Sequence, residues 1–342
     1  MTLTQTAILT KQVITFGLIF LIVGIGGFSG YKMWDAYNKA HMPPVEEKPD
    51  MKFGVLPTPN FPKSAVSSSN YSYTLDTSTG SLPKVGVDSG FEKLIKVYFV
   101  IKPYATFLSS QKSQELAAKF DIKNPPEALS DTTYLFTDAE KKITMDLDSG
   151  NFNYVNEATP SSEEKLEDDE KILGGFENLL STLGVFKPEL REGRTKIVLL
   201  KKEGNKFIPT QLRTEAIGAT ISIWPKSLDK KSIFTEDFNK ALVNASVFNT
   251  ASILENYLSL DFTFWPIDEK TFATYTTKNS EDAFNDLKSG KGVVILEPKK
   301  PQVSITAIYL GYYLSKDYSP YLQPIYVFEG QNFASYVSAI AK

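Results

Sequence analysis

The sequence predicts an α+β protein: a single N-terminal transmembrane helix, followed by units in which a helix packs on antiparallel strands. Three observations predict this class. A long uncharged apolar run stands near the start of the chain, short strand-like runs of alternating residues follow it, and helix-like segments with capping residues stand between those runs. With 342 residues and 42% hydrophobic residues, the chain can bury a sizeable core.

The apolar run covers residues 12–31 and contains no charged side chain. Roughly 20 residues at 1.5 Å each span about 30 Å, the thickness of the hydrocarbon core of a bilayer. A cleaved signal peptide is the alternative, but its apolar core is shorter and ends at a small-x-small cleavage step. Here the run leads into Tyr31, Lys32 and Trp34, side chains that suit the headgroup region. We therefore expect an uncleaved transmembrane helix over 13–31.

The positive-inside count does not decide the orientation of this helix, because Lys11 lies before it and Lys32 and Lys39 lie after it. The sizes of the two flanking parts of the chain are used instead. Residues 1–12 form a short tail, whereas the large folded part lies on the other side. We expect the tail in the cytoplasm and the folded part outside the cytoplasmic membrane. Gly26 and Gly30 form a small-xxx-small step that packs membrane helices together, so a homodimer through this helix is a further expectation.

Prolines are dense between His41 and Lys63, and a serine-rich patch follows them. Closely spaced prolines favour the extended polyproline II conformation, which rises about 3.1 Å per residue. We therefore expect a semi-rigid stalk over 32–70 that holds the folded part away from the bilayer.

Three α+β units are expected after the stalk, over 71–158, 159–245 and 246–342. The first begins with a strand at 96–101 that is rich in β-branched and aromatic residues. Ser109 or Ser110 can then cap a helix, and three short strands follow it.

The later units repeat this order more loosely. In the second, Ser161 and Glu164 fit a capping box at the start of a helix, and Gly184 fits its C-cap. In the third, a helix over 281–287 precedes a long alternating run over 303–314, the pattern of a half-buried antiparallel strand.

The composition excludes several kinds of chemistry. There is no cysteine, and therefore no disulfide, thiolate nucleophile, zinc–thiolate site or iron–sulfur cluster. The single histidine, His41, lies in the proline-rich stretch, where nothing would hold it as a catalytic base. A net charge of −3 gives no basic footprint for nucleic acid. We expect no catalytic residue, cofactor or metal.

Two acidic groupings have simple structural interpretations. The acidic run over 163–170 stands at a predicted helix start, where exposed amides and the helix dipole favour negative charge, so we do not interpret it as a cation site. Asp146, Asp148 and Gly150 resemble a calcium loop only faintly, because the spacing is wrong and strand-like residues follow. A hairpin turn explains them better.

Tyrosines near the C-terminus are the best candidates for a contact surface. Tyrosine offers a large contact area with a polar tip, and recognition surfaces use it for that reason. Sheet and core packing is the alternative role for the same side chains. The candidate partner surface consists of Tyr309, Tyr312, Tyr313, Tyr318, Tyr321 and Tyr326.

Two C-terminal strings have a familiar pattern. Residues 305–313 (ITAIYLGYY) form a strand that ends in an aromatic pair, and residues 321–330 (YLQPIYVFEG) form a Leu-x-Pro-apolar-aromatic strand. Together with the N-terminal anchor and the repeated helix-plus-sheet order, they resemble the PepSY-like domains of YycH/YycI-type membrane regulators. The resemblance covers about two thirds of the chain as a layout. It implies a non-enzymatic extracytoplasmic partner of a membrane protein, often a sensor kinase in that family.

The sequence therefore predicts a membrane-anchored extracytoplasmic protein of the bacterial envelope that binds, and regulates or scaffolds, another envelope protein. Two alternatives stay open at this point. One is an envelope hydrolase that uses paired carboxylates, which needs an acid with a raised pKa beside an ionised partner. The other is a module that binds glycans or peptides in an aromatic-lined groove.

Overall fold

The computed structural model describes residues 3–41, 48–158, 166–204 and 206–341. The chain divides into two compact units, 1–48 and 49–342. We call the second unit the body.

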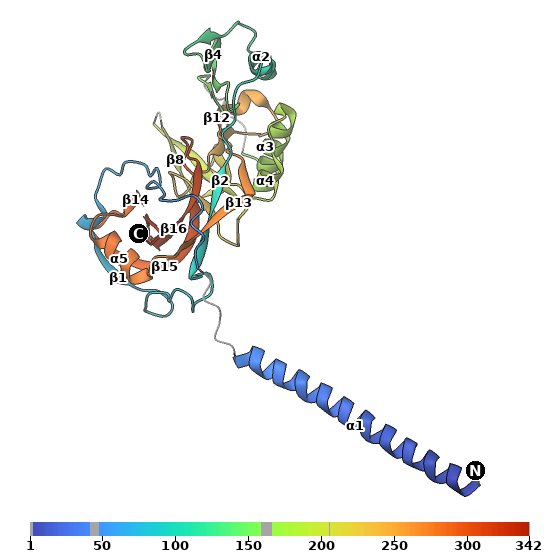
Figure 1. Ribbon diagram of the computed structural model, residues 1–342. Coiled ribbons are helices and arrows are strands. Elements are labelled where there is room, and N and C mark those ends of the chain that lie inside the picture. The colour runs from blue at the N-terminus through green and yellow to red at the C-terminus, as the bar shows by residue number, and fades with distance from the viewer. Residues whose placement is uncertain (1–2, 42–47, 159–165, 205, 342) are drawn as a thin grey trace. The chain divides into compact units, whose positions relative to one another are not determined.

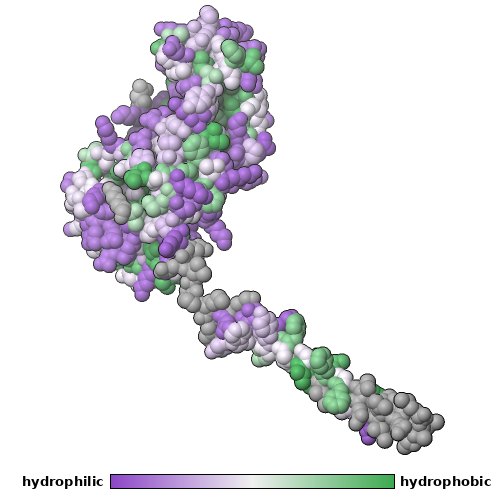
Figure 2. All heavy atoms as spheres, viewed as in Figure 1, coloured by the Kyte–Doolittle hydropathy of each residue, from purple (hydrophilic) through white to green (hydrophobic). Residues whose placement is uncertain are grey.

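The first unit is dominated by one helix, α1 (Leu3–His41). Within the described residues, its segment Ile14–Asn38 is the one helix long and apolar enough to cross a membrane. The apolar side chains described on it are exposed, and Figure 2 shows hydrophobic residues along its surface. A signal sequence would have the same properties.

This helix is longer than predicted, because residues 32–41 of the expected stalk are helical. That stretch contains neither proline nor glycine and includes good helix formers such as Lys32, Met33 and Ala36. The first proline, Pro43, lies outside the described residues.

The body contains two sheets. In the described residues, an eight-stranded sheet has the path β1-β15-β16-β17-β14, with β10 on β15 and with β2 joining β13 to the start of β16. Figure 1 shows β2 and β13 side by side. Its strands are β1 (Ser72–Leu75), β2 (Leu94–Val100), β10 (Ile233–Phe234), β13 (Ile267–Thr276), β14 (Val293–Leu296), β15 (Gln302–Tyr313), β16 (Tyr321–Gly330) and β17 (Phe333–Ser338).

Helix α5 (Ser280–Lys288) covers one face of this sheet. Ala283, Phe284 and Leu287 recur at helical spacing on its apolar side and pack against β15, β16 and β17. Asn279 caps the helix, because its side chain accepts a hydrogen bond from the backbone N–H of Glu281.

The second sheet, as far as the structure describes it, has nine strands in the order β3-β4-β5-β6-β12-β11-β9-β7-β8, all antiparallel to their neighbours. The strands are β3 (Glu127–Ala128), β4 (Thr133–Asp138), β5 (Lys141–Asp146), β6 (Phe152–Asn156), β7 (Thr195–Glu203), β8 (Lys206–Pro209), β9 (Gly218–Ile223), β11 (Val243–Phe248) and β12 (Tyr257–Phe262). Short 3₁₀ helices span Ser68–Asn70, Arg213–Glu215 and Leu254–Asn256.

Three helices pack on the second sheet: α2 (Ser109–Lys119), α3 (Asp169–Leu183) and α4 (Pro188–Arg191). Helix α2 begins at Ser109, but the predicted cap is wrong: the N-cap position is Leu108, which makes no side-chain capping hydrogen bond. The predicted C-cap of α3 is confirmed, since Gly184 is left-handed at φ 80°. Asp168 is the N-cap of α3, and the predicted capping box Ser161–Glu164 lies outside the described residues. Asp169 and Glu170 occupy the first turn of α3, where the helix dipole favours them.

The sheets are not divided at the boundaries predicted between the three α+β units. Strand β2 belongs to the first predicted unit but pairs with β13 of the third, and β12 of the third pairs with β6 of the first. Each predicted unit therefore contributes strands to both sheets. The α+β class is confirmed, whereas consecutive PepSY-like repeats are not.

Candidate functional site

The proline-rich stretch Pro49–Pro62, which we call the strap, lies against the eight-stranded sheet and does not form a free stalk. Phe53, Leu56, Pro59 and Pro62 are buried or half-buried at every third residue, and Pro49 and Phe61 are half-buried outside this period. The strap begins with a turn, in which Gly54 N–H donates to Met51 O at 2.8 Å and both residues have positive φ. After this turn, a spacing of three residues is the one expected of a polyproline II segment with one face on a surface.

The strap carbonyls repeat the same period. Gly54 O accepts a hydrogen bond from the Tyr275 hydroxyl at 2.9 Å, and Pro57 O accepts one from Gln323 Nε2 at 2.9 Å. Three residues further on, Asn60 O accepts from the Tyr313 hydroxyl at 3.0 Å. Three side-chain donors of the sheet therefore hold three carbonyls on one face of the strap.

These donors come from three strands, β13, β16 and β15, and two of them are placed by strand register. Tyr313 and Gln323 are directly opposite each other in the β15–β16 ladder, so both side chains stand on the same face. Burial raises the pKa of the Tyr313 and Tyr275 hydroxyls above the ordinary value. Both therefore remain protonated donors at physiological pH.

Aromatic side chains hold the strap near both ends. Phe53 stacks on Tyr321 with ring centroids 5.0 Å apart, and Phe61 packs on Tyr313 at 4.9 Å. At the start of the strap, Thr274 exchanges two hydrogen bonds with Asp50: Asp50 N–H donates to the Thr274 hydroxyl and Thr274 N–H donates to Asp50 Oδ1. Aromatic-lined grooves of this kind are a recurring means of binding proline-rich peptides.

A cavity of about 870 Å³ lies beside the strap. Leu56, Pro57 and Phe61 line it from the strap, and Val293, Val337, Ile340 and Ala341 from the rest of the body. This size lies within the range of small-molecule sites. The lining combines aliphatic side chains with polar and charged ones.

Three charged residues line the same cavity. Asp286 on α5 binds Lys278 Nζ through Oδ2 at 2.7 Å and Lys291 Nζ through Oδ1 at 2.9 Å. Burial alone would raise the pKa of Asp286, but the hydrogen bonds from the two ammonium groups outweigh it and hold that pKa below its ordinary value. The side chain of Lys278 is 12% exposed and that of Lys291 is 72% exposed.

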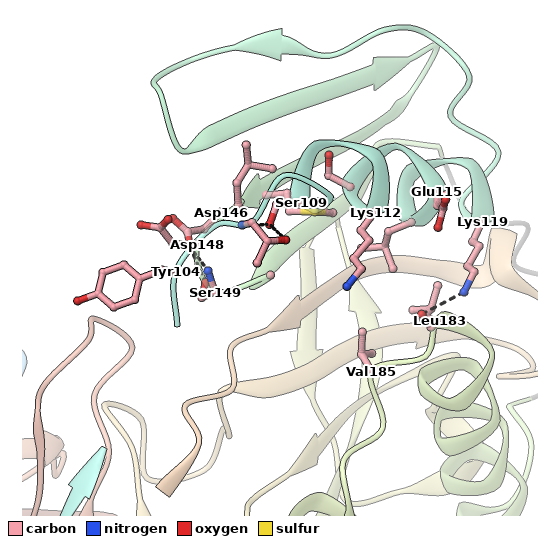
Figure 3. A pocket seen from close by; sticks show the side chains of 16 residues that line it. Tyr104, Ser109, Lys112, Glu115, Lys119, Asp146, Asp148, Ser149, Leu183 and Val185 are labelled. Atoms are coloured by element: carbon pink, nitrogen blue, oxygen red, sulfur yellow. Dashed lines mark hydrogen bonds between the residues drawn. The ribbon is translucent and has the colours of Figure 1, made fainter. Parts of the chain in front are cut away.

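Figure 3 shows a second, smaller cavity of about 420 Å³, between α2, the β5–β6 turn and the end of α3. Lys119 reaches across it to the carbonyls of Thr182 and Leu183, at 2.9 and 3.1 Å. Because these carbonyls are at the C-terminal end of α3, the ammonium satisfies them and complements the helix dipole. Lys112 points into the same gap toward Val185.

Asp146 and Asp148 beside this cavity belong to the β5–β6 turn, which is the role predicted for them. Asp146 Oδ1 accepts from the backbone N–H and the hydroxyl of Ser149, at 2.7 and 2.6 Å. Asp148 Oδ1 accepts from Ala105 N–H at 2.9 Å. Gly150 has φ 72°, the left-handed value that such a turn requires. No group of three or more potential metal ligands occurs among the described residues.

The six tyrosines do not form an exposed partner surface, which corrects the prediction. Tyr312, Tyr313 and Tyr326 are buried, and Tyr309, Tyr318 and Tyr321 are half-buried. The reason is that β15 and β16 are interior strands, with α5 on one face and the strap on the other.

The buried tyrosines have separate roles. Tyr326 donates to Lys278 O at 2.6 Å beneath α5, and Tyr313 binds the strap. Tyr312 lies 3.4 Å from Asp229, which also accepts from the Tyr98 hydroxyl at 2.6 Å. This Asp229 cluster was not expected from the sequence, because its members are distant in the chain.

Gly26 and Gly30 lie on α1, and nothing in the described chain packs within 4 Å of either position. Their pairing with a second copy therefore stays a prediction. His41 is the last residue of α1.

Comparisons with known proteins add little to this geometry. No family model and no curated protein matches the sequence. Among solved structures, the chain is similar to an uncharacterized protein from Eubacterium rectale ATCC 33656, with 12% identity and a TM-score of 0.44, over 79% of this chain and 89% of that one. The resemblance to YycH/YycI-type regulators stays a prediction without support from these comparisons.

Proposed function

We propose that this chain is a single-pass membrane-anchored protein that binds and regulates another envelope protein without catalysis. Its N-terminal tail lies in the cytoplasm and its body outside the cytoplasmic membrane. The apolar segment Ile14–Asn38 of α1 supports the anchor by length and composition. The family resemblance suggests a membrane protein such as a sensor kinase as the partner.

The proposal rests on one observation: side chains of the eight-stranded sheet donate hydrogen bonds to the carbonyls of Gly54, Pro57 and Asn60, which are spaced three residues apart in the proline-rich strap. Such recognition uses backbone carbonyls, which any extended chain offers, and aromatic packing at the ends. In the isolated chain the ligand is its own strap. We propose that an extended, proline-containing segment of the partner takes the place of the strap on this face.

Competition from the strap controls how tightly a partner segment binds. A ligand attached by a short linker acts at an effective concentration on the order of millimolar, so it competes strongly with a free segment. A partner therefore binds well only when it offers better contacts or when the strap is loosened. Because the strap follows α1 in the sequence, the membrane tether and the binding face belong to one connected element.

A strap-release experiment tests this function. The full-length protein is reconstituted in nanodiscs, and a fluorescent peptide with the sequence of residues 49–62 is titrated by anisotropy. The variant Phe53→Ala with Phe61→Ala should bind the peptide at least tenfold more tightly than the parent, because both anchors of the internal competitor are lost. Val55→Ala is the matched control, since Val55 is a strap residue that is 95% exposed.

A further variant tests where the peptide binds. Adding Gln323→Ala to the released variant should weaken peptide binding again, because the peptide would lose the donor for its Pro57 carbonyl. Released protein that still fails to bind the peptide would contradict the proposal. In intact cells, photo-crosslinking from the strap should recover a membrane protein as the main adduct, whereas wall fragments would favour a glycan-binding module or a hydrolase.

A further inference from the structure

We propose that the cavity beside the strap binds a single-chain amphiphile with an anionic head group, such as a fatty-acid carboxylate or a lysolipid phosphate. This goes beyond the proposed function, since the site exists in the strap-bound state and does not require exchange with a partner.

The apolar part of the cavity fits an alkyl chain. Its volume of about 870 Å³ is bounded by aliphatic side chains of β14, β17 and the strap, with Val293, Val337 and Leu56 among them. Binding a ligand that displaces water from an exposed apolar lining of this extent is favourable in free energy. Each methylene group added to a bound chain should tighten binding roughly fourfold until the cavity is filled.

The charged part of the cavity selects the head group. Lys278, Lys291 and Asp286 are the charged residues among its described lining, and two positive charges with one negative charge leave a net charge of +1. An anion neutralises this excess, whereas a neutral head does not. Lys278 is held by Asp286 in a half-buried position, so it has little freedom to move.

Lys291 is the group that can bind the head directly. Its ammonium contacts Asp286 at 2.9 Å, but its side chain is 72% exposed and can turn toward a ligand at little loss. Ser338 and Thr58 also line the cavity and bring hydroxyl donors to it. Lysine is a compact charge with rotatable donors, which suits carboxylate and phosphate heads alike.

Photolabelling tests this site in the full-length protein. The chain is reconstituted in nanodiscs and irradiated with a diazirine-bearing 12-carbon fatty acid, a matched alkyl phosphate and a matched neutral alcohol. Adducts are mapped by peptide mass spectrometry. We expect the anionic probes to label residues 55–62 and 337–341 at least fivefold more than the alcohol does, and the stronger labelling of the two anions shows which head group the cavity prefers.

Two variants make the result specific. Lys291→Glu should reduce anionic labelling in the cavity about tenfold and leave labelling by the alcohol unchanged, whereas Lys299→Glu, on an exposed loop, should change neither. Ala341→Trp should block labelling by all three probes, because Ala341 is exposed and lines the cavity. Circular dichroism and thermal melting confirm that each variant is folded.

Equal labelling by the alcohol and the anions, or cavity labelling that Lys291→Glu and Ala341→Trp leave intact, would overturn the inference. The peptide titration described above is a separate readout. A protein that exchanges its strap but takes up no amphiphile would disprove this inference alone, and the reverse result would disprove the proposed function alone.

Discussion

Gln323 donates its side-chain amide to the carbonyl of Pro57 at 2.9 Å, although the two residues are far apart in the chain and Gln323 is only 3% exposed. A buried amide is stable only with a partner, so the strap is part of the folded body and not an attachment to it. The strap and the sheet therefore stabilise each other.

Gln323→Ala should loosen the strap without unfolding the body. Loss of this bond leaves the Pro57 carbonyl without its donor, and we expect a loss of about 1–2 kcal/mol from strap binding. Because the sequence contains no cysteine, spin labels at Val55→Cys and Ile253→Cys report the strap position by dipolar spectroscopy. A broader, longer distance distribution is expected, and an unchanged one would count against the role given to Gln323.

Phe61→Ala should release the C-terminal half of the strap. The Phe61 ring contacts both Tyr313 and Tyr336, so its removal should weaken strap binding by about 2 kcal/mol. Hydrogen exchange is the measurement: the backbone amides of Asn60 and Phe61 should exchange at least tenfold faster, while those of β16 stay protected. Lys63→Ala, an exposed neighbour, is the control.

Acidification should weaken the contribution of Asp286. Its folded pKa lies below that of the unfolded chain, so the stability it adds is present above pH ~4 and is lost as the pH falls through the folded pKa. Asp286→Asn should lower the free energy of unfolding by about 1–3 kcal/mol at pH 7. Urea unfolding from pH 7 to pH 3 should show this difference shrinking. A difference that grows on acidification would contradict the stabilising role given to these ion pairs. Asp131→Asn, at an exposed position, is the control variant.

Tyr98→Phe tests the Asp229 cluster. The hydroxyl of Tyr98 donates to Asp229 Oδ2 at 2.6 Å, and Lys96 Nζ binds Oδ1 at 3.1 Å. Loss of a hydrogen bond to a charged acceptor should destabilise the body by about 1.5–2 kcal/mol. Tyr104→Phe is the matched control, since Tyr104 is largely exposed. Equal melting temperatures for the two variants would contradict this role.

Gly26→Ile with Gly30→Ile tests pairing of the apolar helix. If two copies meet at this step, the larger side chains separate the helices and crosslinked dimer falls severalfold. Gly17→Ile, elsewhere on the same helix, should leave the dimer unchanged. Crosslinking in membranes followed by gel analysis measures it, and a dimer that persists in the double variant would exclude this interface.

Local features of the fold were predictable from the sequence, because they depend on neighbouring residues. The uncharged run before Tyr31 predicted the apolar helix, Gly184 predicted a helix end, and the alternating residues of 303–314 predicted the strand β15. Each follows from a periodicity or a cap that a short window contains.

Long-range pairing was not predictable in the same way. The β2–β13 ladder joins Val97 to Ala273, and no periodicity in either strand specifies that partner. The stalk prediction was wrong for a related reason: the prolines do not specify what the segment contacts, and the distant donors Tyr275, Gln323 and Tyr313 place it on the sheet. Because the position of the strap was not predictable, the tyrosines that it covers were predicted to be available to a partner.

The position of the strap between the apolar helix and the body has a mechanical consequence. Tension on the tether enters the body at Asp50, and the contacts of Phe53, Gly54, Pro57 and Asn60 follow in chain order. We expect such a series to open one contact at a time and to yield at low force, before either sheet is strained.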